Sequence, residues 1–194
     1  RLNMTDRTYS LEELPDAYRE LAGRGLTSTI VHDEVDPLCH PLGPNNKLIF
    51  SPGIVTGTAA PTSARISVGA KSPLTGGIKE ANSGTSFGQT LAHMGVRALI
   101  VEGKPEEEGW WLAHVTWSED KGEPEVEFLP ADEYTGQDLY EVFPNVFERF
   151  GDKVGVAGIG VSGEFGYGNS GVVFEDQEGR PSRYAGRGGL GAVM

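Results

Sequence analysis

The sequence predicts an α+β domain that contains two β-sheets and a few flanking helices. Short apolar runs bounded by glycine or proline, such as 47–50 and 98–103, indicate buried strands. The apolar residues of 138–150 recur at spacings of three and four, which is typical of an amphipathic helix. Residues 47–57 also resemble residues 153–163, because each stretch begins with lysine and ends with Val-Thr-Gly or Val-Ser-Gly. This resemblance predicts an internal duplication, with the two sheets related by a pseudo-two-fold axis.

The composition fits one folded domain of 194 residues. A net charge of −12 argues against nucleic acid and against an anionic membrane as partners, because both are negatively charged. Cys39 is the only cysteine, so the chain cannot form an internal disulfide or a Cys-x-x-Cys metal site. No apolar run reaches the roughly 20 residues that cross a bilayer. We therefore expect a cytoplasmic protein.

The first elements expected are helical. Ser10 and Glu13 have the Ser-x-x-Glu spacing of a capping box, and apolar residues follow at helical spacing. The pattern predicts a helix over 11–22 that is ended by Gly23, and then a second short helix over 27–35.

Strands dominate the middle of the sequence. A strand is expected at 66–70, and two more at 111–117 and 126–129, which would form a hairpin across the charged turn 118–124. A helix is expected over 89–94, before a glycine that would end it.

Residues 183–194 form a glycine-rich run that carries arginines in an otherwise acidic protein. Arg183 and Arg187 offer planar guanidinium groups suited to phosphate, and glycine lets backbone N–H groups turn toward a ligand. The run therefore predicts an anion-binding site. Under the predicted duplication, Asn82-Ser83-Gly84 is a second glycine loop that faces the same ligand. Because residue 1 is not methionine and the run stops at residue 194, we expect residues 1–194 to be a piece of a longer chain.

Other chemistry has little support in the sequence. Two Gly-x-Gly-x-x-Gly matches begin at Gly158 and Gly186. The first cannot be a dinucleotide fingerprint, because the glycines and aromatic residues of 164–171 do not propagate the helix that would hold a pyrophosphate. The second has no convincing strand before it and no chain after it for that helix. The histidines and acidic residues form no metal-binding or acid–base set, so no catalytic residue is predicted.

Several stretches together resemble the N-terminal domain of the aldehyde ferredoxin oxidoreductase family. They are Ser-Pro-Gly-Ile-Val-Thr-Gly-Thr-Ala-Ala-Pro-Thr-Ser-Ala-Arg at 51–65, Lys-Ser-Pro-Leu-Thr-Gly at 71–76, Ala-Asn-Ser-Gly at 81–84 with Phe-Gly at 87–88, and Ala-Gly-Arg-Gly-Gly-Leu-Gly-Ala-Val-Met at 185–194. The resemblance covers essentially the whole chain in one order of motifs, so it is more specific than any single glycine pattern.

The resemblance implies that 1–194 is a single N-terminal cofactor-binding domain of a longer chain. This domain would form a base for a tungsten or molybdenum bis-pterin (molybdopterin) cofactor, whose two pterins are joined through phosphates by Mg²⁺. Arg65 would lie between a pterin and a nearby iron–sulfur cluster. Asn82 and Tyr184 would approach the Mg²⁺ through their backbone carbonyls. The residues that would line pterin and phosphate are Gly84, Arg183, Gly186 and Arg187.

This sequence also departs from the family pattern. Tyr184 stands where the family often has alanine, and Ala64, Thr85 and Ser86 replace family glycines, which puts the backbone path of both loops in question. The [4Fe–4S] cluster of the family is bound by cysteines of later regions that are absent from this chain.

The whole protein is expected to oxidise aldehydes to carboxylic acids and to pass electrons to ferredoxin or an electron-transfer subunit. The expected partners are the remaining domains of its own chain and a small aldehyde. A homodimer with a second copy of the protein is also compatible with these expectations. Two alternatives remain at this point. One is a non-catalytic cofactor-carrier or assembly subunit, and the other is a simple phosphate- or nucleotide-binding module.

Overall fold

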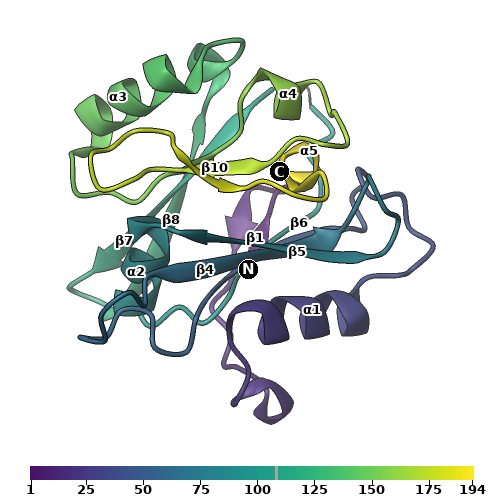
Figure 1. The fold of residues 1–194 in the computed structure, drawn as a ribbon, viewed down its shortest axis with the longest axis horizontal. Helices are drawn as coiled ribbons and strands as arrows, with labels where there is room; N and C mark the ends of the chain where they lie inside the picture. The colour runs from purple at the N-terminus through teal and green to yellow at the C-terminus, as the bar shows by residue number, and fades with distance from the viewer. Residues whose placement is uncertain (108) are drawn as a thin grey trace.

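The computed structural model describes residues 1–107 and 109–194. Its main body has four layers (Figure 1), in which helix α1 (Gly23–Glu34) covers one face of a six-stranded sheet and a three-stranded sheet lies on the other face. Helix α3 (Leu139–Phe150) covers the far side of the three-stranded sheet. The predicted α+β class is confirmed.

The six-stranded sheet has the order β2-β1-β6-β3-β4-β5. The strands pair antiparallel except for β1 with β6, which are parallel. Strand β5 forms one edge of the sheet and is paired to β4 along its whole length. The bounds are β1 Leu2–Asn3, β2 Thr8–Tyr9, β3 Lys47–Pro52, β4 Arg65–Lys71, β5 Ile78–Gly84 and β6 Leu99–Glu102.

The three-stranded sheet has the order β11-β10-β9, with bounds β9 Ala157–Gly158, β10 Val172–Phe174 and β11 Arg183–Ala185. Val172, Phe174 and Ala185 pack on the six-stranded sheet and form one core with Phe50, Ile66, Val68 and Leu190, whereas Val173 packs with residues of α3. Phe174 contributes an aromatic ring that meets Phe50 edge to face, with the ring centroids 6.3 Å apart. The two sheets are thus joined by apolar packing and share one core.

The helices are short, and their ends are explained by local chemistry. Helix α3 begins after Asp138, whose carboxylate accepts a hydrogen bond from Tyr140 N at 2.8 Å, and it ends at Gly151 with φ of 94°. Pro144 lies inside α3, in its second turn, and the helix continues past it. The remaining helices are α2 Ser86–His93, α4 Val161–Glu164 and α5 Leu190–Val193, with 3₁₀ turns at Asp16–Tyr18 and Asp132–Tyr134. Among the described residues, no helix combines the length and the hydrophobicity that crossing a bilayer requires.

The predicted hairpin is confirmed and is longer than expected. Strands β7 (Trp111–Ser118) and β8 (Glu123–Pro130) pair antiparallel along their full length. The hairpin contacts the rest of the fold through a few side chains. The ring of His114 lies 4.4 Å from that of Phe150, and the guanidinium of Arg7 lies 4.3 Å over the ring of Trp111.

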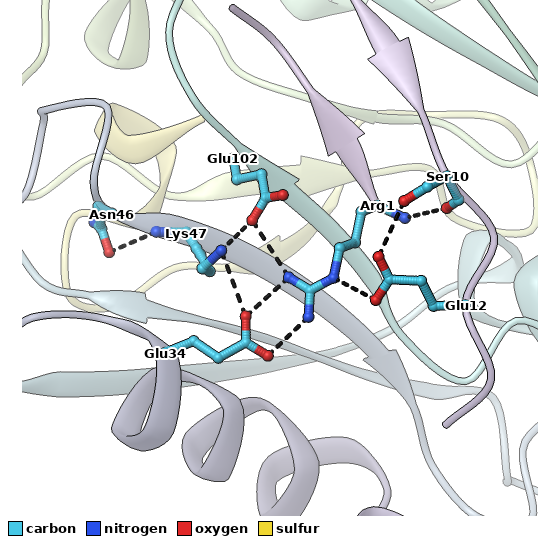
Figure 2. A network of polar contacts seen from close by, with 7 residues as sticks. All are labelled: Arg1, Ser10, Glu12, Glu34, Asn46, Lys47 and Glu102. Atoms are coloured by element: carbon cyan, nitrogen blue, oxygen red, sulfur yellow. Dashed lines mark hydrogen bonds and ion pairs between the residues drawn. The ribbon is translucent and has the colours of Figure 1, made fainter. Parts of the chain in front are cut away.

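A partly buried ion network ties α1 to the sheet (Figure 2). Glu34, at the end of α1, accepts hydrogen bonds of 2.8 Å from Nη1 and Nη2 of Arg1 and lies 3.4 Å from the ammonium of Lys47. Lys47 also contacts Glu102, at the end of β6. The paired guanidinium of Arg1 lowers the pKa of Glu34. The network therefore holds the end of α1 against β3 and β6.

The predicted helix over 11–22 is wrong. Residues 11–15 are not helical, because Pro15 has no N–H for a helical bond and the Ser10 hydroxyl donates to Glu12 at 3.1 Å instead of forming a capping box. The apolar residues that suggested a helix still pack against α1. Gly23, expected to end a helix, is the first residue of α1, and its N–H donates to the Ser51 hydroxyl at 2.9 Å.

The internal duplication is not confirmed. Residues 47–52 form a six-residue strand of the large sheet, whereas the matching part of 153–163 contains the two-residue strand β9 and the start of α4. A similar order of residue types therefore accompanies two different local structures, because the later stretch has Gly155 inside its apolar run and Gly158 and Gly160 shortly after it.

Candidate functional site

The candidate site lies where the edges of the two stacked sheets meet. Strand β5 is an edge of the large sheet, β11 is an edge of the small one, and the two strands contact each other. Every residue that the family resemblance assigned to the cofactor lies on these strands, at their ends or on β4 beside them. The structure therefore places along this shared edge Arg65, Asn82, Gly84, Arg183, Tyr184, Gly186 and Arg187.

Arg65 and Gly84 are direct partners across β4 and β5. A β-carbon at residue 84 would lie 3.4 Å from Nη1 of Arg65, so the missing side chain leaves room for this guanidinium. The backbone of Arg65 is also fixed, because its carbonyl accepts hydrogen bonds from Gly53 N at 3.0 Å and from the Thr56 hydroxyl at 2.9 Å. An exposed arginine side chain thus extends from a well-held backbone.

Asn82-Ser83-Gly84 is not a loop, which corrects the sequence prediction. The three residues form the end of β5, and the Asn82 amide donates to the Ser67 hydroxyl at 3.3 Å. The motif was expected in a loop because asparagine, serine and glycine are poor strand formers. Here they occupy an edge strand whose other side is unpaired among the described residues.

The backbone of Asn82 points to that free edge. Ser72 N donates to Gly77 O at 2.9 Å and Thr85 N donates to Ala64 O at 3.1 Å, at the two ends of the β4–β5 register. Hydrogen-bonded and non-hydrogen-bonded pairs alternate along an antiparallel ladder. Counting from either bond places Asn82 in a non-hydrogen-bonded pair. Its carbonyl therefore faces away from β4.

Arg183 and Tyr184 lie on β11, after a turn held by Asp176. The Asp176 carboxylate accepts hydrogen bonds from Arg180 N at 3.0 Å and from the Ser182 hydroxyl at 2.7 Å. These bonds lower the pKa of Asp176, the bond from the Arg180 backbone most of all. The Tyr184 side chain is 55% exposed and its hydroxyl donates to the Pro181 carbonyl at 3.0 Å.

The glycines of the tail have two different roles. Gly188 and Gly189 have φ of 91° and 74°, and β-carbons there would lie 2.2 Å from Lys79 Cγ and 2.3 Å from the Gly168 carbonyl. A β-carbon at Gly191 would lie 2.4 Å from the Gly171 carbonyl. These three glycines are therefore required by packing. Gly186 is exposed, and a β-carbon there would meet only Tyr184 within 4 Å, at 3.5 Å.

Among the described residues, the arginines of the site form no ion pairs. Within the part of the chain that the structure describes, Arg65, Arg183 and Arg187 have no carboxylate within 4.0 Å. The same is true of Arg24 and Arg97, whereas the other arginines are paired, namely Arg1, Arg7, Arg19, Arg149 and Arg180. In a chain of net charge −12, three exposed arginines without ion pairs among the described residues give this sheet edge a local positive charge, and this makes it the candidate site for an anion.

Sequence reasoning missed Glu175, which is 3% exposed and lies between the two sheets. Its Oε1 accepts hydrogen bonds from the Thr85 hydroxyl at 2.7 Å and from Phe87 N at 2.9 Å, and its Oε2 accepts one from Val156 N at 2.7 Å. The Ser86 hydroxyl donates to Oε1 as well. No signal in the sequence marks it, because its donors come from residues 85–87 and 156, which are distant in sequence from each other.

The two glycine fingerprints behave differently. As expected, the one that begins at Gly158 opens only the four-residue helix α4. The expectation that no strand precedes Gly186 is wrong, because β11 ends at Ala185. This strand was missed because only three residues form it and two of them, Arg183 and Tyr184, are exposed. Across the described residues there is no cluster of three or more His, Cys, Asp or Glu that could hold a metal.

The comparison with known proteins agrees with the family resemblance that the sequence motifs indicated. The chain is 39% identical over 197 residues to the tungsten-containing aldehyde ferredoxin oxidoreductase of Pyrococcus abyssi, which it covers for 30% of its length. It is 38% identical to the enzyme of the same description from Pyrococcus furiosus, again over 30% of that protein. The match includes all of the present chain in both cases. The chain thus spans about 30% of the length of these relatives.

A solved structure is also similar along the whole chain. It is the active site complex BamBC of benzoyl coenzyme A reductase in complex with 1,5-dienoyl-CoA, and the match has a TM-score of 0.85 at 26% identity over 28% of that chain. The family model of the aldehyde ferredoxin oxidoreductase N-terminal domain matches residues 1–194. The chain therefore belongs to the aldehyde ferredoxin oxidoreductase family and corresponds to its N-terminal domain.

Proposed function

We propose that the joined edges of β5 and β11 bind a tungsten bis-pterin cofactor, or its molybdenum counterpart, in a longer oxidoreductase. The observation that carries the proposal is the set of three exposed arginines without ion pairs, Arg65, Arg183 and Arg187, which surround this edge. Phosphate groups are suited to guanidinium forks, and an otherwise acidic chain would repel them elsewhere.

The other residues of the edge fit the same ligand. Gly186 leaves open backbone at which a flat pterin ring or a phosphate could approach closely, and Gly84 leaves the space in which the Arg65 guanidinium lies beside the proposed ligand. The outward carbonyl of Asn82 is a hard oxygen donor of the kind that Mg²⁺ accepts, and we propose the Tyr184 carbonyl as a second. A carbonyl ligand does not depend on its side chain, so tyrosine in place of alanine is compatible with this role.

The cofactor, when bound, supplies the two-electron redox chemistry of the proposed enzyme. The residues of this chain bind and orient it, and they do not exchange protons with the substrate. The unpaired arginines would stabilise a reduced, more negative state of the cofactor, because a positive charge near a redox group favours its reduced form. Arg65 would lie toward a [4Fe–4S] cluster held by another part of the protein.

The whole protein is proposed to oxidise an aldehyde to a carboxylic acid and to pass the electrons to ferredoxin. This proposal rests on the two tungsten-containing aldehyde ferredoxin oxidoreductases. They are 38–39% identical to this chain and are thus more similar to it than the solved reductase, which is 26% identical. The remaining domains of its own chain would cover the exposed face of the cofactor. A second candidate, reduction of an aromatic thioester, is supported by the benzoyl coenzyme A reductase structure.

The test is metal and pterin analysis of the full-length protein purified without oxygen. We expect tungsten or molybdenum together with pterin and iron, and reduction of ferredoxin or a viologen dye with an aldehyde but not with a cyclic dienoyl-CoA thioester. Oxidation of the dienoyl-CoA alone would favour the second candidate. Full-length protein that is active with aldehydes and contains neither metal would contradict the proposal.

A further inference from the structure

Glu175 is a buried carboxylate that the cofactor proposal does not use. It follows β10 directly and is 3% exposed. Its oxygens accept hydrogen bonds from four donors, namely the hydroxyls of Thr85 and Ser86 and the backbone N–H groups of Phe87 and Val156. Within the described chain no lysine, arginine or histidine lies within 4.0 Å of it. Four neutral donors and the N-terminus of α2 therefore stabilise this carboxylate.

Capping α2 does not by itself explain Glu175. The Thr85 hydroxyl oxygen already caps this helix, since it accepts a hydrogen bond from Phe87 N at 3.1 Å. Burying a carboxylate is costly unless it gains several strong hydrogen bonds, and a local cap at Thr85 avoids that cost. What Glu175 adds is a connection between layers, because it belongs to the small sheet and its donors at 85–87 follow the edge strand of the large sheet.

The hydrogen bonds of Glu175 lead directly to the first half of the candidate site. Thr85 follows Gly84, and Thr85 N donates to the Ala64 carbonyl at 3.1 Å. Ala64 precedes Arg65, which is the cross-strand partner of Gly84. Thr85 is therefore held on one side by Glu175 and on the other by the strand that carries Arg65.

Glu175 is also adjacent to the strand pair that carries the second half of the site. The preceding residue, Phe174, is the cross-strand partner of Arg183 in β11. The carboxylate therefore lies between the strand pair that carries Arg65 and the strand pair that carries Arg183. Phe174 itself is fully buried in the core that the two sheets share.

We propose that Glu175 is a positioning residue that sets the spacing between the Arg65–Gly84 pair and the β11 arginine, and through this spacing the affinity for the cofactor. It does not touch the ligand. The inference rests on the proposed function, and it gives Thr85 and Ser86 a shared role. Their hydroxyls donate to Glu175, so the two hydroxyl residues and the carboxylate form one unit.

The test compares Glu175→Gln with Asp138→Asn in the full-length protein. An amide cannot accept all of these bonds, because its NH₂ group only donates. Asp138 is a matched control, since it caps α3 by accepting from Tyr140 N and has no contact with the site. Tungsten and pterin retained after dialysis, the electron paramagnetic resonance spectrum of the bound metal, and amide exchange of 84–87 and 183–185 are measured for each variant.

We expect Glu175→Gln to weaken metal retention by about 10- to 100-fold, the range typical of residues that orient ligand-holding groups. The residual metal is expected to show a heterogeneous spectrum, and exchange is expected to rise at both 84–87 and 183–185. Asp138→Asn is expected to retain wild-type metal. The single variant Ser86→Ala and the double variant Glu175→Gln/Ser86→Ala are measured in the same way. The fold-loss of metal retention in the double variant is expected to be smaller than the product of the fold-losses in the two single variants.

Two results would overturn the inference while leaving the proposed function intact. One is wild-type retention in Glu175→Gln, and the other is an equal loss in Glu175→Gln and Asp138→Asn, which would show that replacing a capping carboxylate by an amide far from the site has the same effect. Wild-type full-length protein without tungsten, molybdenum or pterin would overturn the proposed function itself, and this inference with it.

Discussion

The guanidinium of Arg65 lies over Gly84, at a distance of 3.4 Å from the place where a β-carbon of residue 84 would stand. The same β-carbon would also lie 3.4 Å from the Ala64 carbonyl. Both distances are at the lower limit of ordinary van der Waals contact, so a β-carbon here would touch the guanidinium. Glycine at this position therefore leaves the Arg65 side chain the space in which it lies.

Gly84→Ala is expected to displace the Arg65 side chain while the domain still folds, because the guanidinium is the mobile end of a long side chain. The change in free energy of unfolding should stay within about 1 kcal/mol. Cofactor content of the full-length protein should fall several-fold, as measured by metal and pterin analysis. Gly77→Ala is the control, since a β-carbon there meets nothing within 4 Å. Equal cofactor content in the two variants would contradict the role given to Gly84.

The two roles of the tail glycines lead to opposite expectations for Gly188→Ala and Gly186→Ala. At Gly188 the positive φ of 91° and the 2.2 Å approach to Lys79 Cγ should destabilise the protein, by about 1–3 kcal/mol for the backbone strain alone. At Gly186 the backbone needs no positive φ and there is space, so stability should be unchanged while cofactor content falls. Thermal unfolding and metal analysis of the two full-length variants separate these effects. Loss of stability in both would show that Gly186 is also a packing position.

Much of the fold follows from the sequence because its strands and its longest helix carry strong local patterns. Strands β3, β4 and β6 are apolar runs between breakers, and α3 has an apolar stripe with Asp138 as its cap. The region before α1 could not be predicted in this way. Its apolar spacing fits a helix, but tertiary packing against α1 satisfies the same side chains without one.

The site was predictable as a set of residues but not as an arrangement. Exposed arginines and glycines could be identified one by one. Their positions along one shared edge, however, depend on the contact between two edge strands from different sheets. Asn82 shows the limit, because local propensity favours a loop and its pairing with Ser67 decides for a strand. Glu175 shows it more clearly, since its four donors come from two segments that are distant in sequence.

The turn before β11 is expected to loosen in acid. The pKa of Asp176 is lower in the folded protein than in the unfolded chain, so its carboxylate stabilises the turn fully above its ordinary pKa of about 4, and this stabilisation is lost as pH falls through the folded-state pKa. Amide exchange of 176–185 in the full-length protein, corrected for intrinsic rates, should therefore increase below about pH 4. Asp176→Asn should show raised exchange at neutral pH and a weaker dependence on acid. If amide exchange of 176–185 has the same pH dependence in the wild-type protein and in Asp176→Asn, this account is contradicted.

The last prediction concerns the unpaired arginines, which carry the proposed function. Neutralising Arg183 or Arg187 by substitution with Gln removes a charged donor that has no ion pair within the described chain, so it should leave stability within about 0.5 kcal/mol. If each arginine contacts phosphate or pterin, losing a hydrogen bond to a charged group should cost about 1.5–3 kcal/mol of binding, or roughly 10- to 150-fold in cofactor retention. Arg149→Gln is the matched control, because Arg149 is a surface arginine on α3 that pairs with Glu133 at 2.7 Å.

Salt supplies an independent measurement of the same contacts. Because interactions between exposed charges are screened, retention by the wild-type full-length protein should weaken as ionic strength rises, and less steeply in Arg183→Gln and Arg187→Gln than in Arg149→Gln. An unchanged salt dependence together with unchanged retention in the first two variants would mean that these guanidinium groups face solvent and not the cofactor. The anion site would then have to lie away from the β5–β11 edge, since Arg65 would be the one remaining cation of the proposed set.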